Sequence, residues 1–129
     1  MKDQYQVPVA VFLFKRVELA EKMLKCLERI QPEKLFVICD GARKDVPGEQ
    51  KQVEQVRALF ENVSWPCEIY RNYAAENMGC DIRVPSGISW VFEHVEEAMI
   101  LEDDCIPADD FFPYVQEVLE TYRDHPQVM

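Results

Sequence analysis

The sequence predicts an α/β fold, a three-layer α/β/α sandwich around a mostly parallel sheet with strand order 3-2-1-4. Two observations predict it. Short apolar runs alternate with longer segments in which apolar residues recur at helical spacing. The runs are continuously apolar, as expected of strands that are covered on both faces. With 129 residues, 48% of them hydrophobic and 29% charged, the chain is long enough for one domain with a single core.

The first half of the chain contains two strand–helix units. Residues 7–14 read Val-Pro-Val-Ala-Val-Phe-Leu-Phe and predict the first strand, and residues 17–30 predict a helix with an apolar stripe. Residues 35–39 predict the second strand, which Asp40-Gly41 ends as a turn signal. Helical spacing then recurs over residues 48–63.

The second half repeats the alternation with shorter elements. Residues 67–70 predict a weaker third strand, residues 72–81 a loop, residues 83–95 a helix and residues 98–101 the fourth strand. Asp109 or Asp110 is expected to cap a last helix that runs to about Arg123. Strands that alternate with helices form parallel sheets with right-handed crossovers, which favours the order 3-2-1-4.

This strand order predicts where a ligand binds. The chain reverses direction between strands 1 and 4, and ligands of such sheets bind outside the carboxyl ends of the strands at that point. Lys15-Arg16 follows the first strand, Asp40-Gly41 the second, and Glu102-Asp103-Asp104 the fourth. We therefore expect these groups to line one crevice, with two cations facing an acidic block.

The triplet Glu102-Asp103-Asp104 is the most informative motif. Three adjacent carboxylates repel one another, which raises their pKa values unless a cation neutralises them. Oxygen ligands suit Mg²⁺ or Mn²⁺, which commonly complete their shell with substrate phosphates. The triplet thus predicts a divalent metal site for a phosphorylated ligand. The alternative is a solvated acidic turn before a helix.

Three neighbouring features have both a functional and a structural interpretation. Arg16 could hold a phosphate oxygen through its planar fork of donors, or it could simply begin a surface helix with Lys15. Asp40 could accept hydrogen bonds from a base or ribose, or it could only form the Asp-Gly turn. The Asn77-Met78-Gly79 loop with Arg83 could cover a ligand or be an ordinary connection.

The formal net charge is −10, and its distribution excludes several partners. Residues 84–122 contain ten acidic residues and no Lys or Arg, whereas the rest of the chain is balanced. An acidic surface argues against nucleic acid and anionic membranes as partners. No apolar run is long enough to span a membrane, and no secretory signal layout is present.

The five cysteines are odd in number and lack a C-x-x-C pair. This pattern indicates a reducing compartment, the cytoplasm, without structural disulfides or a zinc site. Cys39, Cys67 and Cys105 lie in or beside apolar runs and are expected to be small core residues.

These residues resemble a known family. The segment Ile100-Leu101-Glu102-Asp103-Asp104, followed by the Asp-Phe-Phe helix start at residues 110–112, is similar to the inverting N-acetylglucosaminyltransferase I group of GT-A glycosyltransferases. That group has a D-x-D-type motif after the fourth strand of a Rossmann-like nucleotide-diphospho-sugar transferase fold. Some bacterial proteins with this pattern carry a hemolysin-like label. The resemblance covers nearly the whole chain in element order and is specific only in this segment.

The resemblance implies a role for each matching position. Asp104 would be the direct ligand of Mn²⁺ or Mg²⁺, and Glu102 and Asp103 would contact ribose and metal-bound water. Arg16 sits where the group keeps a phosphate-contacting Arg, and Asp40 where it keeps a base-contacting Asp. No residue of this chain is assigned as the catalytic base.

The implied function is transfer of a sugar from a nucleotide-diphosphate sugar, first of all a UDP-sugar, to an acceptor glycan or another hydroxyl compound. We expect residues 1–129 to form the nucleotide-sugar-binding domain without the acceptor half, with Pro126–Met129 beginning another strand. Two alternatives stay open: a non-catalytic nucleotide or sugar binding module, and a metal-dependent phosphoryl hydrolase. Hydrolases of that kind often place a nucleophilic Asp after the first strand, where this chain has Lys15-Arg16.

Overall fold

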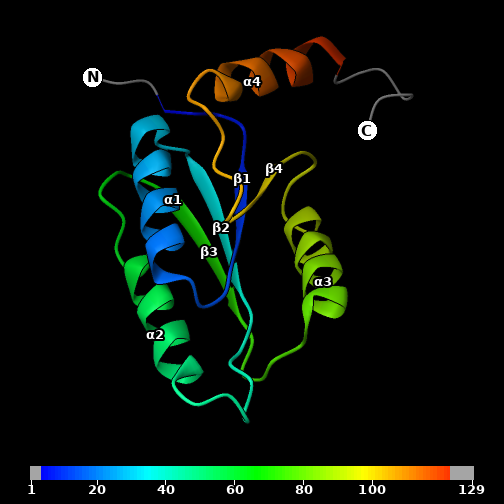
Figure 1. The fold of residues 1–129 in the computed structure, drawn as a ribbon. Helices are drawn as coiled ribbons and strands as arrows, with labels where there is room; N and C mark the ends of the chain where they lie inside the picture. The colour runs from blue at the N-terminus through cyan, green and yellow to red at the C-terminus, as the bar shows by residue number, and fades with distance from the viewer. Residues whose placement is uncertain (1–3, 123–129) are drawn as a thin grey trace.

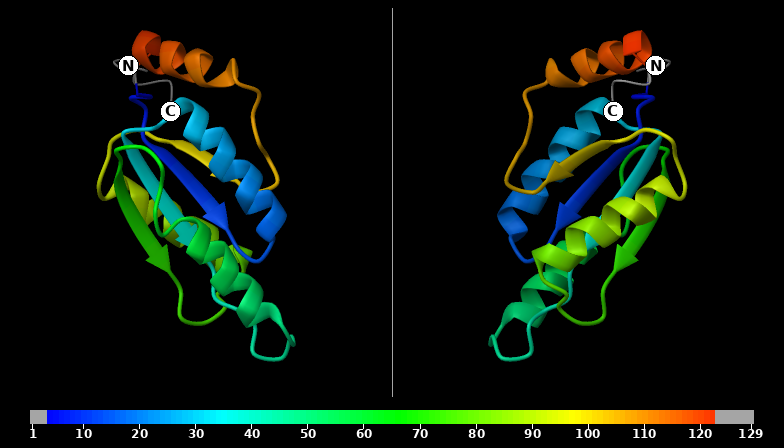
Figure 2. Two further views of the ribbon diagram at one scale, coloured as in Figure 1. Left: turned by 90° about the vertical axis from the view of Figure 1, so that its left-hand side faces the viewer. Right: turned by 90° about the vertical axis from the view of Figure 1, so that its right-hand side faces the viewer.

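The computed structural model describes residues 4–122 and has an α/β architecture with a four-stranded, all-parallel sheet in the order β3-β2-β1-β4. Helices α1 and α2 cover one face of the sheet and α3 covers the other, so that the predicted three layers and strand order are confirmed (Figures 1 and 2). In chain order the elements are β1 (Val9–Leu13), α1 (Val17–Ile30), β2 (Lys34–Cys39), α2 (Glu49–Leu59), β3 (Glu68–Tyr73), α3 (Cys80–Phe92), β4 (Met99–Glu102) and α4 (Phe111–Tyr122). The arrangement is compatible with a Rossmann-like fold.

Alternation along the two central strands creates two cores. Every residue of β1 is buried, because successive side chains point to opposite faces and both faces are covered. One core lies beneath α1 and α2 and takes Val9, Val11 and Leu13 from β1. The other lies beneath α3 and takes Ala10 and Phe12. This double burial explains why the strand reads as an unbroken apolar run.

Helix α3 lies close to its face of the sheet. Gly87 permits the approach, since a Cβ added there would come within 2.6 Å of the Phe12 ring and 3.1 Å of Ile38 Cγ2. The close packing fixes the start of α3 beside the carboxyl ends of β1 and β2, where the predicted crevice lies.

Several element boundaries differ from the predicted ones for physical reasons. Helix α2 ends at Leu59 rather than at residue 63, and the Arg71 guanidinium donates to the carbonyls of Phe60 and Glu61, which follow the helix. Strand β3 continues to Tyr73 because its pairing with β2 extends to Cys39. Helix α3 begins at Cys80, three residues early, after Gly79.

Helix α4 lies across the amino-terminal end of the sheet, away from the predicted crevice (Figure 1). Phe112 is buried against Tyr5, whose hydroxyl donates to the Phe112 carbonyl at 2.6 Å. The helix starts directly after Asp110, while the Asp109 carboxylate pairs with Arg29 at 3.0 Å. The expected helix end at Arg123 and the expected strand at residues 126–129 lie outside the described residues.

Candidate functional site

The carboxyl ends of β4, β1 and β2 open into a cleft of about 440 Å³. All five residues that the sequence singled out as site residues line it: Arg16, Asp40, Glu102, Asp103 and Asp104. Other polar residues join them: Lys15, Arg43, Asn77 and Arg83. The cleft lies where the strand order reverses between β1 and β4, which is where parallel α/β sheets bind ligands.

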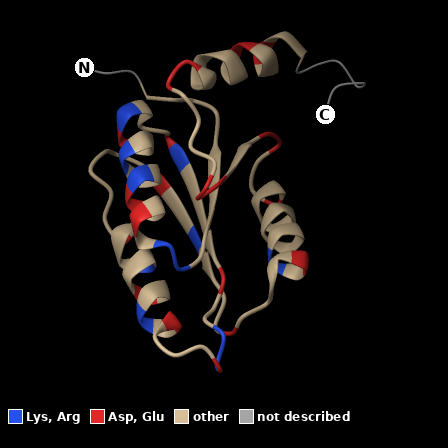
Figure 3. Cartoon of the chain, viewed as in Figure 1, with Lys and Arg blue, Asp and Glu red and all other residues tan. Residues whose placement is uncertain are grey.

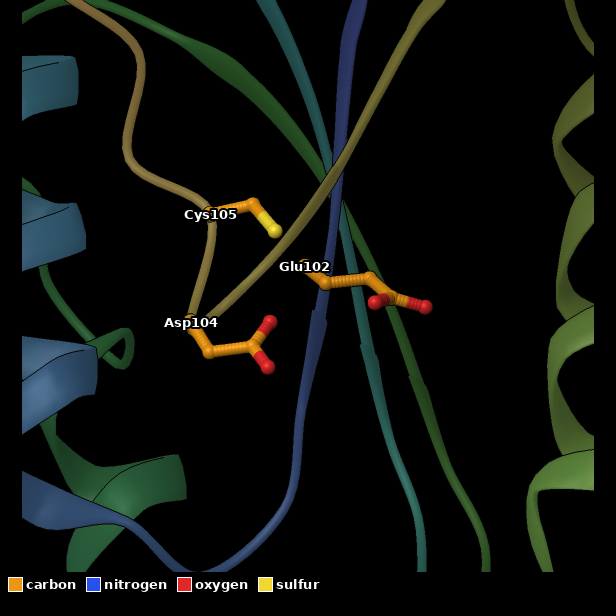
Figure 4. Close-up of side chains that lie close together, drawn as sticks. All are labelled: Glu102, Asp104 and Cys105. Carbon is orange, nitrogen blue, oxygen red and sulfur yellow. The ribbon is translucent and has the colours of Figure 1, made fainter.

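One end of the cleft is lined by Glu102, Asp103 and Asp104. These residues, together with the adjacent Cys105, are here termed the acidic end. One carboxylate oxygen of Glu102, one of Asp104 and the Cys105 Sγ lie within 4.8 Å of one another, and all three residues are exposed (Figure 4). Glu102 ends β4, and Asp104 lies in the turn that follows, which brings its side chain back beside Glu102. The grouping could hold a divalent cation.

Asp103 does not belong to this ligand group. Its backbone N–H donates to the Phe12 carbonyl at 3.2 Å, which continues the pairing of β4 with β1 and leaves the side chain partly buried. Burial raises the pKa of Asp103, the Arg16 charge lowers it, and the charges of Asp104 and Glu102 raise it further. A cation at the acidic end would ease this repulsion.

Cys105 is a site residue that the sequence reasoning missed. Its prediction as a core residue is wrong, whereas Cys39 is buried as expected and Cys67 is partly buried. The Cys105 N–H donates to the Glu102 carbonyl at 3.0 Å and closes a turn after β4. This turn places the thiol beside the carboxylates of Glu102 and Asp104. A hydrogen bond with Asp104 and the charge of that carboxylate raise the pKa of the Cys105 thiol. The position of Cys105 directly after the acidic triplet was the signal that could have identified it as a site residue.

The loop between β1 and α1 carries two basic residues, Lys15 and Arg16 (Figure 3). Arg16 Nη1 lies 3.8 Å from Asp104 Oδ2, and both side chains are about half exposed. An exposed pair at this distance contributes little to stability, so Arg16 is free to turn toward a bound anion. Its neighbour Lys15 is held differently, since its Nζ donates to Glu49 Oε1 at 2.9 Å.

Glu49 is a fully buried carboxylate that organises two cations at the edge of the cleft. Besides Lys15, it accepts hydrogen bonds from the backbone N–H, Nε and Nη2 of Arg43 at 2.7, 3.0 and 2.7 Å. The Arg43 hydrogen bonds hold the pKa of Glu49 well below its usual range, against the opposing effect of burial, and Lys15 adds to the lowering. In the sequence Glu49 looked like an ordinary acid in the first turn of a helix, so nothing marked it.

The opposite end of the cleft, here termed the inner end, consists of Asp40, residues 77–79 and Arg83. Asp40 Oδ1 accepts the N–H groups of Gly41 and Met78, each at 2.8 Å. Its Oδ2 accepts the Gly79 N–H at 3.0 Å and the Asn77 amide at 3.2 Å. Four hydrogen bonds occupy the lone pairs of the carboxylate. Asp40 therefore fastens the 77–79 loop and the start of α3 to the end of β2.

Gly41 makes this fastening possible. A Cβ at position 41 would lie 2.5 Å from the backbone carbon of Glu76, so that only glycine allows the two loops to approach so closely. Asp40-Gly41 follows the end of β2 as predicted, but the backbone at these two residues forms no turn, so the expected Asp-Gly turn is wrong. The Asp40 carboxylate binds the 77–79 loop, and contact between Asp40 and a base stays a prediction.

The cleft as a whole is electrically polarised. Carboxylates gather at one end, with the Cys105 thiol beside them, and the cleft is also lined by Arg16, Lys15 and Arg43. Two carboxylates suit Mg²⁺ and Mn²⁺, and the adjacent thiol adds a softer ligand that favours Mn²⁺. The residues present fit a divalent cation beside an anion such as a diphosphate.

Comparisons of the chain with protein-family models, with curated proteins and with solved structures find no match. Across residues 4–122, no helix combines the length and the apolar character needed to cross a bilayer.

Proposed function

We propose that this chain is the nucleotide-binding domain of a metal-dependent glycosyltransferase of the GT-A type, which binds a nucleotide-diphosphate sugar and delivers the sugar to an acceptor hydroxyl. The observation that carries the proposal is the polarised cleft at the switch point between β1 and β4, where Asp104 lies opposite Arg16 and beside Glu102. The resemblance of the triplet and the following helix start to the N-acetylglucosaminyltransferase I group favours a UDP-sugar.

Each side chain has a role in this proposal. Asp104 and Glu102 hold the divalent cation, with Cys105 beside them. When bound, the cation supplies Lewis-acid stabilisation to the departing diphosphate. Arg16 shares the negative charge of the diphosphate through its exposed guanidinium, and Lys15 and Arg43 add positive potential from their fixed positions on Glu49. All five cysteines are free thiols, which supports our placing the domain in the reducing cytoplasm.

The direct test is calorimetric titration of the chain with UDP-GlcNAc, with and without Mn²⁺. We expect binding that requires Mn²⁺ and that weakens roughly 100-fold in Asp104→Ala, because a ligand to the cation is lost. Asp109→Ala is the matched control, since it removes an exposed carboxylate that pairs with Arg29 outside the cleft. Binding without Mn²⁺, or equal binding by Asp104→Ala and the wild type, would contradict the proposal.

Two enzymatic assays separate the alternative functions. A phosphoryl hydrolase cleaves a generic phosphate ester, and we expect no such cleavage, because Phe14, Lys15 and Arg16 follow β1 where a nucleophilic Asp would stand. A non-catalytic module binds UDP-GlcNAc but releases no UDP in the presence of sugar or polyol acceptors. Release of UDP that depends on an acceptor favours the transferase.

A further inference from the structure

Lys15, Arg43 and Glu49 form a group at the side of the cleft that is termed the basic cluster below. Lys15 and Arg43 line the cleft with side chains that are 32% and 47% exposed, whereas the Glu49 side chain that binds both is fully buried. Glu49 accepts four hydrogen bonds, one from the Lys15 ammonium and three from Arg43. These bonds occupy the lone pairs of the carboxylate. The basic cluster therefore offers donors and one net positive charge to a ligand, but no free acceptor.

Many donors of the basic cluster are unused. Both Nη1 hydrogens and one Nη2 hydrogen of Arg43, and two hydrogens of the Lys15 ammonium, have no hydrogen-bond partner among the described residues. The edge of a guanidinium binds two oxygens of an oxyanion, and an ammonium binds a further oxygen as a point charge. A phosphate group has oxygens for both cations, whereas a planar carboxylate is saturated by the guanidinium alone. The free donors therefore favour a phosphate group.

Glu49 holds both cations in place before a ligand arrives. It contacts Nε and Nη2 of Arg43 at 3.0 and 2.7 Å, a two-point contact that fixes the plane of the guanidinium, and the Lys15 Nζ at 2.9 Å. Side chains that are already ordered lose less conformational entropy on binding than free surface side chains do. Glu49 also begins helix α2, whose amino-terminal end adds positive potential. The basic cluster is thus a preorganised anion site.

The basic cluster is separate from the acidic end. The adjacent residues Lys15 and Arg16 turn to different partners, Lys15 to Glu49 at the start of α2 and Arg16 to Asp104 after β4. Strands β4 and β2 flank β1, so the strands that precede the acidic end and Arg43 are two strand spacings apart, about 10 Å. The two phosphates of a diphosphate share one oxygen and are much closer together. The free carboxylates of the acidic end repel a phosphate group unless a cation intervenes, whereas the basic cluster attracts it directly.

We propose that Lys15 and Arg43, held by Glu49, form a second anion site of the cleft, which binds a phosphate group without a divalent cation. This phosphate group is distinct from the diphosphate that the proposed function puts between the cation and Arg16. Inorganic phosphate and a phosphate carried by a sugar share the chemistry that the site recognises. The inference goes beyond the proposed function, since the site needs neither the divalent cation nor a nucleotide.

The test is calorimetric titration of the chain with inorganic phosphate in the presence of EDTA. We expect Lys15→Gln and Arg43→Lys each to weaken phosphate binding about tenfold, since each removes hydrogen bonds between a cation and the anion. Arg43→Lys keeps the charge and loses only the planar fork of donors, so that its effect separates geometry from net charge. Lys44→Gln is the matched control, because Lys44 follows Arg43 in the chain but pairs with Glu76 and does not line the cleft. It should change the affinity less than about twofold.

A parallel titration with glucose 6-phosphate separates the two sources of the phosphate group, with glucose as the control for contacts to the sugar ring. Tighter binding of glucose 6-phosphate than of inorganic phosphate assigns a phosphate carried by a sugar, and equal or weaker binding assigns free phosphate. Absence of binding by either anion up to about 10 mM overturns the inference. Equal losses in Lys44→Gln and Lys15→Gln overturn it as well, because the effect would then come from net charge.

Two further titrations test whether the site is separate from the diphosphate. A loss of phosphate affinity in Arg16→Gln as large as in Lys15→Gln overturns the inference, since the phosphate would then lie beside the acidic end. In a chain saturated with UDP and Mg²⁺, phosphate binding that persists supports a separate site. Exclusion of phosphate by UDP assigns Lys15 and Arg43 to the diphosphate and overturns the inference. Failure of UDP itself to bind counts against the proposed function and leaves the titration in EDTA unaffected.

A measurement on the wild type covers the case in which the variants do not fold, since each removes a partner of the buried Glu49. Tungstate is a tetrahedral oxyanion like phosphate, and its anomalous scattering locates it in crystals soaked without a divalent cation. We expect tungsten beside Lys15 and Arg43. Tungsten beside Arg16 alone, or no bound tungsten in the cleft, rejects the site.

Discussion

The two ends of the cleft are built on opposite principles. At the acidic end, Glu102, Asp104 and Cys105 are exposed and close to one another, and the only ion pair there among the described residues is the long contact between Arg16 and Asp104. At the inner end, Asp40 is buried and accepts four hydrogen bonds. The carboxylates of the acidic end are thus available to a ligand, whereas the carboxylate of the inner end is fully engaged.

The difference teaches how to separate ligand binding from folding in this molecule. Exposed like charges destabilise a fold slightly or not at all, so substitutions at the acidic end should leave folding nearly unchanged. A buried carboxylate with every lone pair occupied is explained by the loops that it holds. Matched substitutions at the two ends should therefore affect different measurements.

The largest contrast is expected between Asp40→Asn and Asp104→Asn. The amide introduced at position 40 would replace one acceptor by a donor that faces N–H groups, and we expect a loss of about 3 kcal/mol in the free energy of unfolding. Asp104→Asn should change it by less than about 0.5 kcal/mol, because the side chain is exposed among like charges. Urea unfolding measures both values. Equal losses would show that the acidic end also supports the fold.

The next effect concerns Glu49 and its dependence on pH. Arg43 holds the pKa of Glu49 low in the folded chain, whereas an unfolded glutamate titrates near about 4.3. Below about pH 5 the unfolded state then binds more protons, so stability falls as the pH falls through that range. Glu49→Gln should lower the melting temperature at pH 7 by at least about 5 °C and flatten the acid dependence.

Glu54→Gln is the control for this prediction, because Glu54 is an exposed acid on the same helix, hydrogen-bonded only to Gln50 within the described residues. It should leave both the melting temperature and its acid dependence nearly unchanged. A Glu49→Gln variant with the acid dependence of the wild type would mean that the buried carboxylate does not govern acid stability.

Much of the fold followed from the sequence because its central strands are covered on both faces. Residues 9–13 and 34–39 are buried almost without exception, so unbroken apolar runs identified them, and right-handed crossovers then limited the strand order. The boundaries that failed depend on distant partners. Arg71 binds the carbonyls where α2 ends, and no local pattern announces such a contact.

The site also contains residues that the sequence could predict and residues that it could not. Arg16 and the acidic triplet could be placed together because parallel strands end at one edge of a sheet. Glu49 and Arg43 could not, since their importance comes from burial and mutual hydrogen bonds that appear only in the folded chain. Cys105 was misjudged because it lies beside an apolar run, which suggested the core, whereas the turn after β4 leaves the thiol exposed.

A smaller effect is expected from Arg16→Gln, which tests the basic side of the acidic end. Loss of one exposed cation from the diphosphate should weaken Mn²⁺-dependent UDP binding about tenfold at low salt, and less at high salt because the interaction is screened. Arg29→Gln removes a similarly exposed cation from the far end of α1, outside the cleft. It should leave UDP binding unchanged at both low and high salt. Similar losses of UDP affinity in the two variants would show that the effect comes from the net charge of the chain and not from the position of Arg16.

The smallest expected effect distinguishes metals at Cys105. If the thiol joins Glu102 and Asp104 around the cation, Cys105→Ser should weaken binding of Mn²⁺ several-fold in the presence of UDP while Mg²⁺ binding stays nearly constant, since sulfur suits the softer ion. Cys80→Ser is the control, because Cys80 is also exposed and lines the cleft but lies on α3. Calorimetric competition between the two ions measures the ratio. A ratio unchanged in Cys105→Ser would leave the carboxylates as the ligands and the thiol as a bystander.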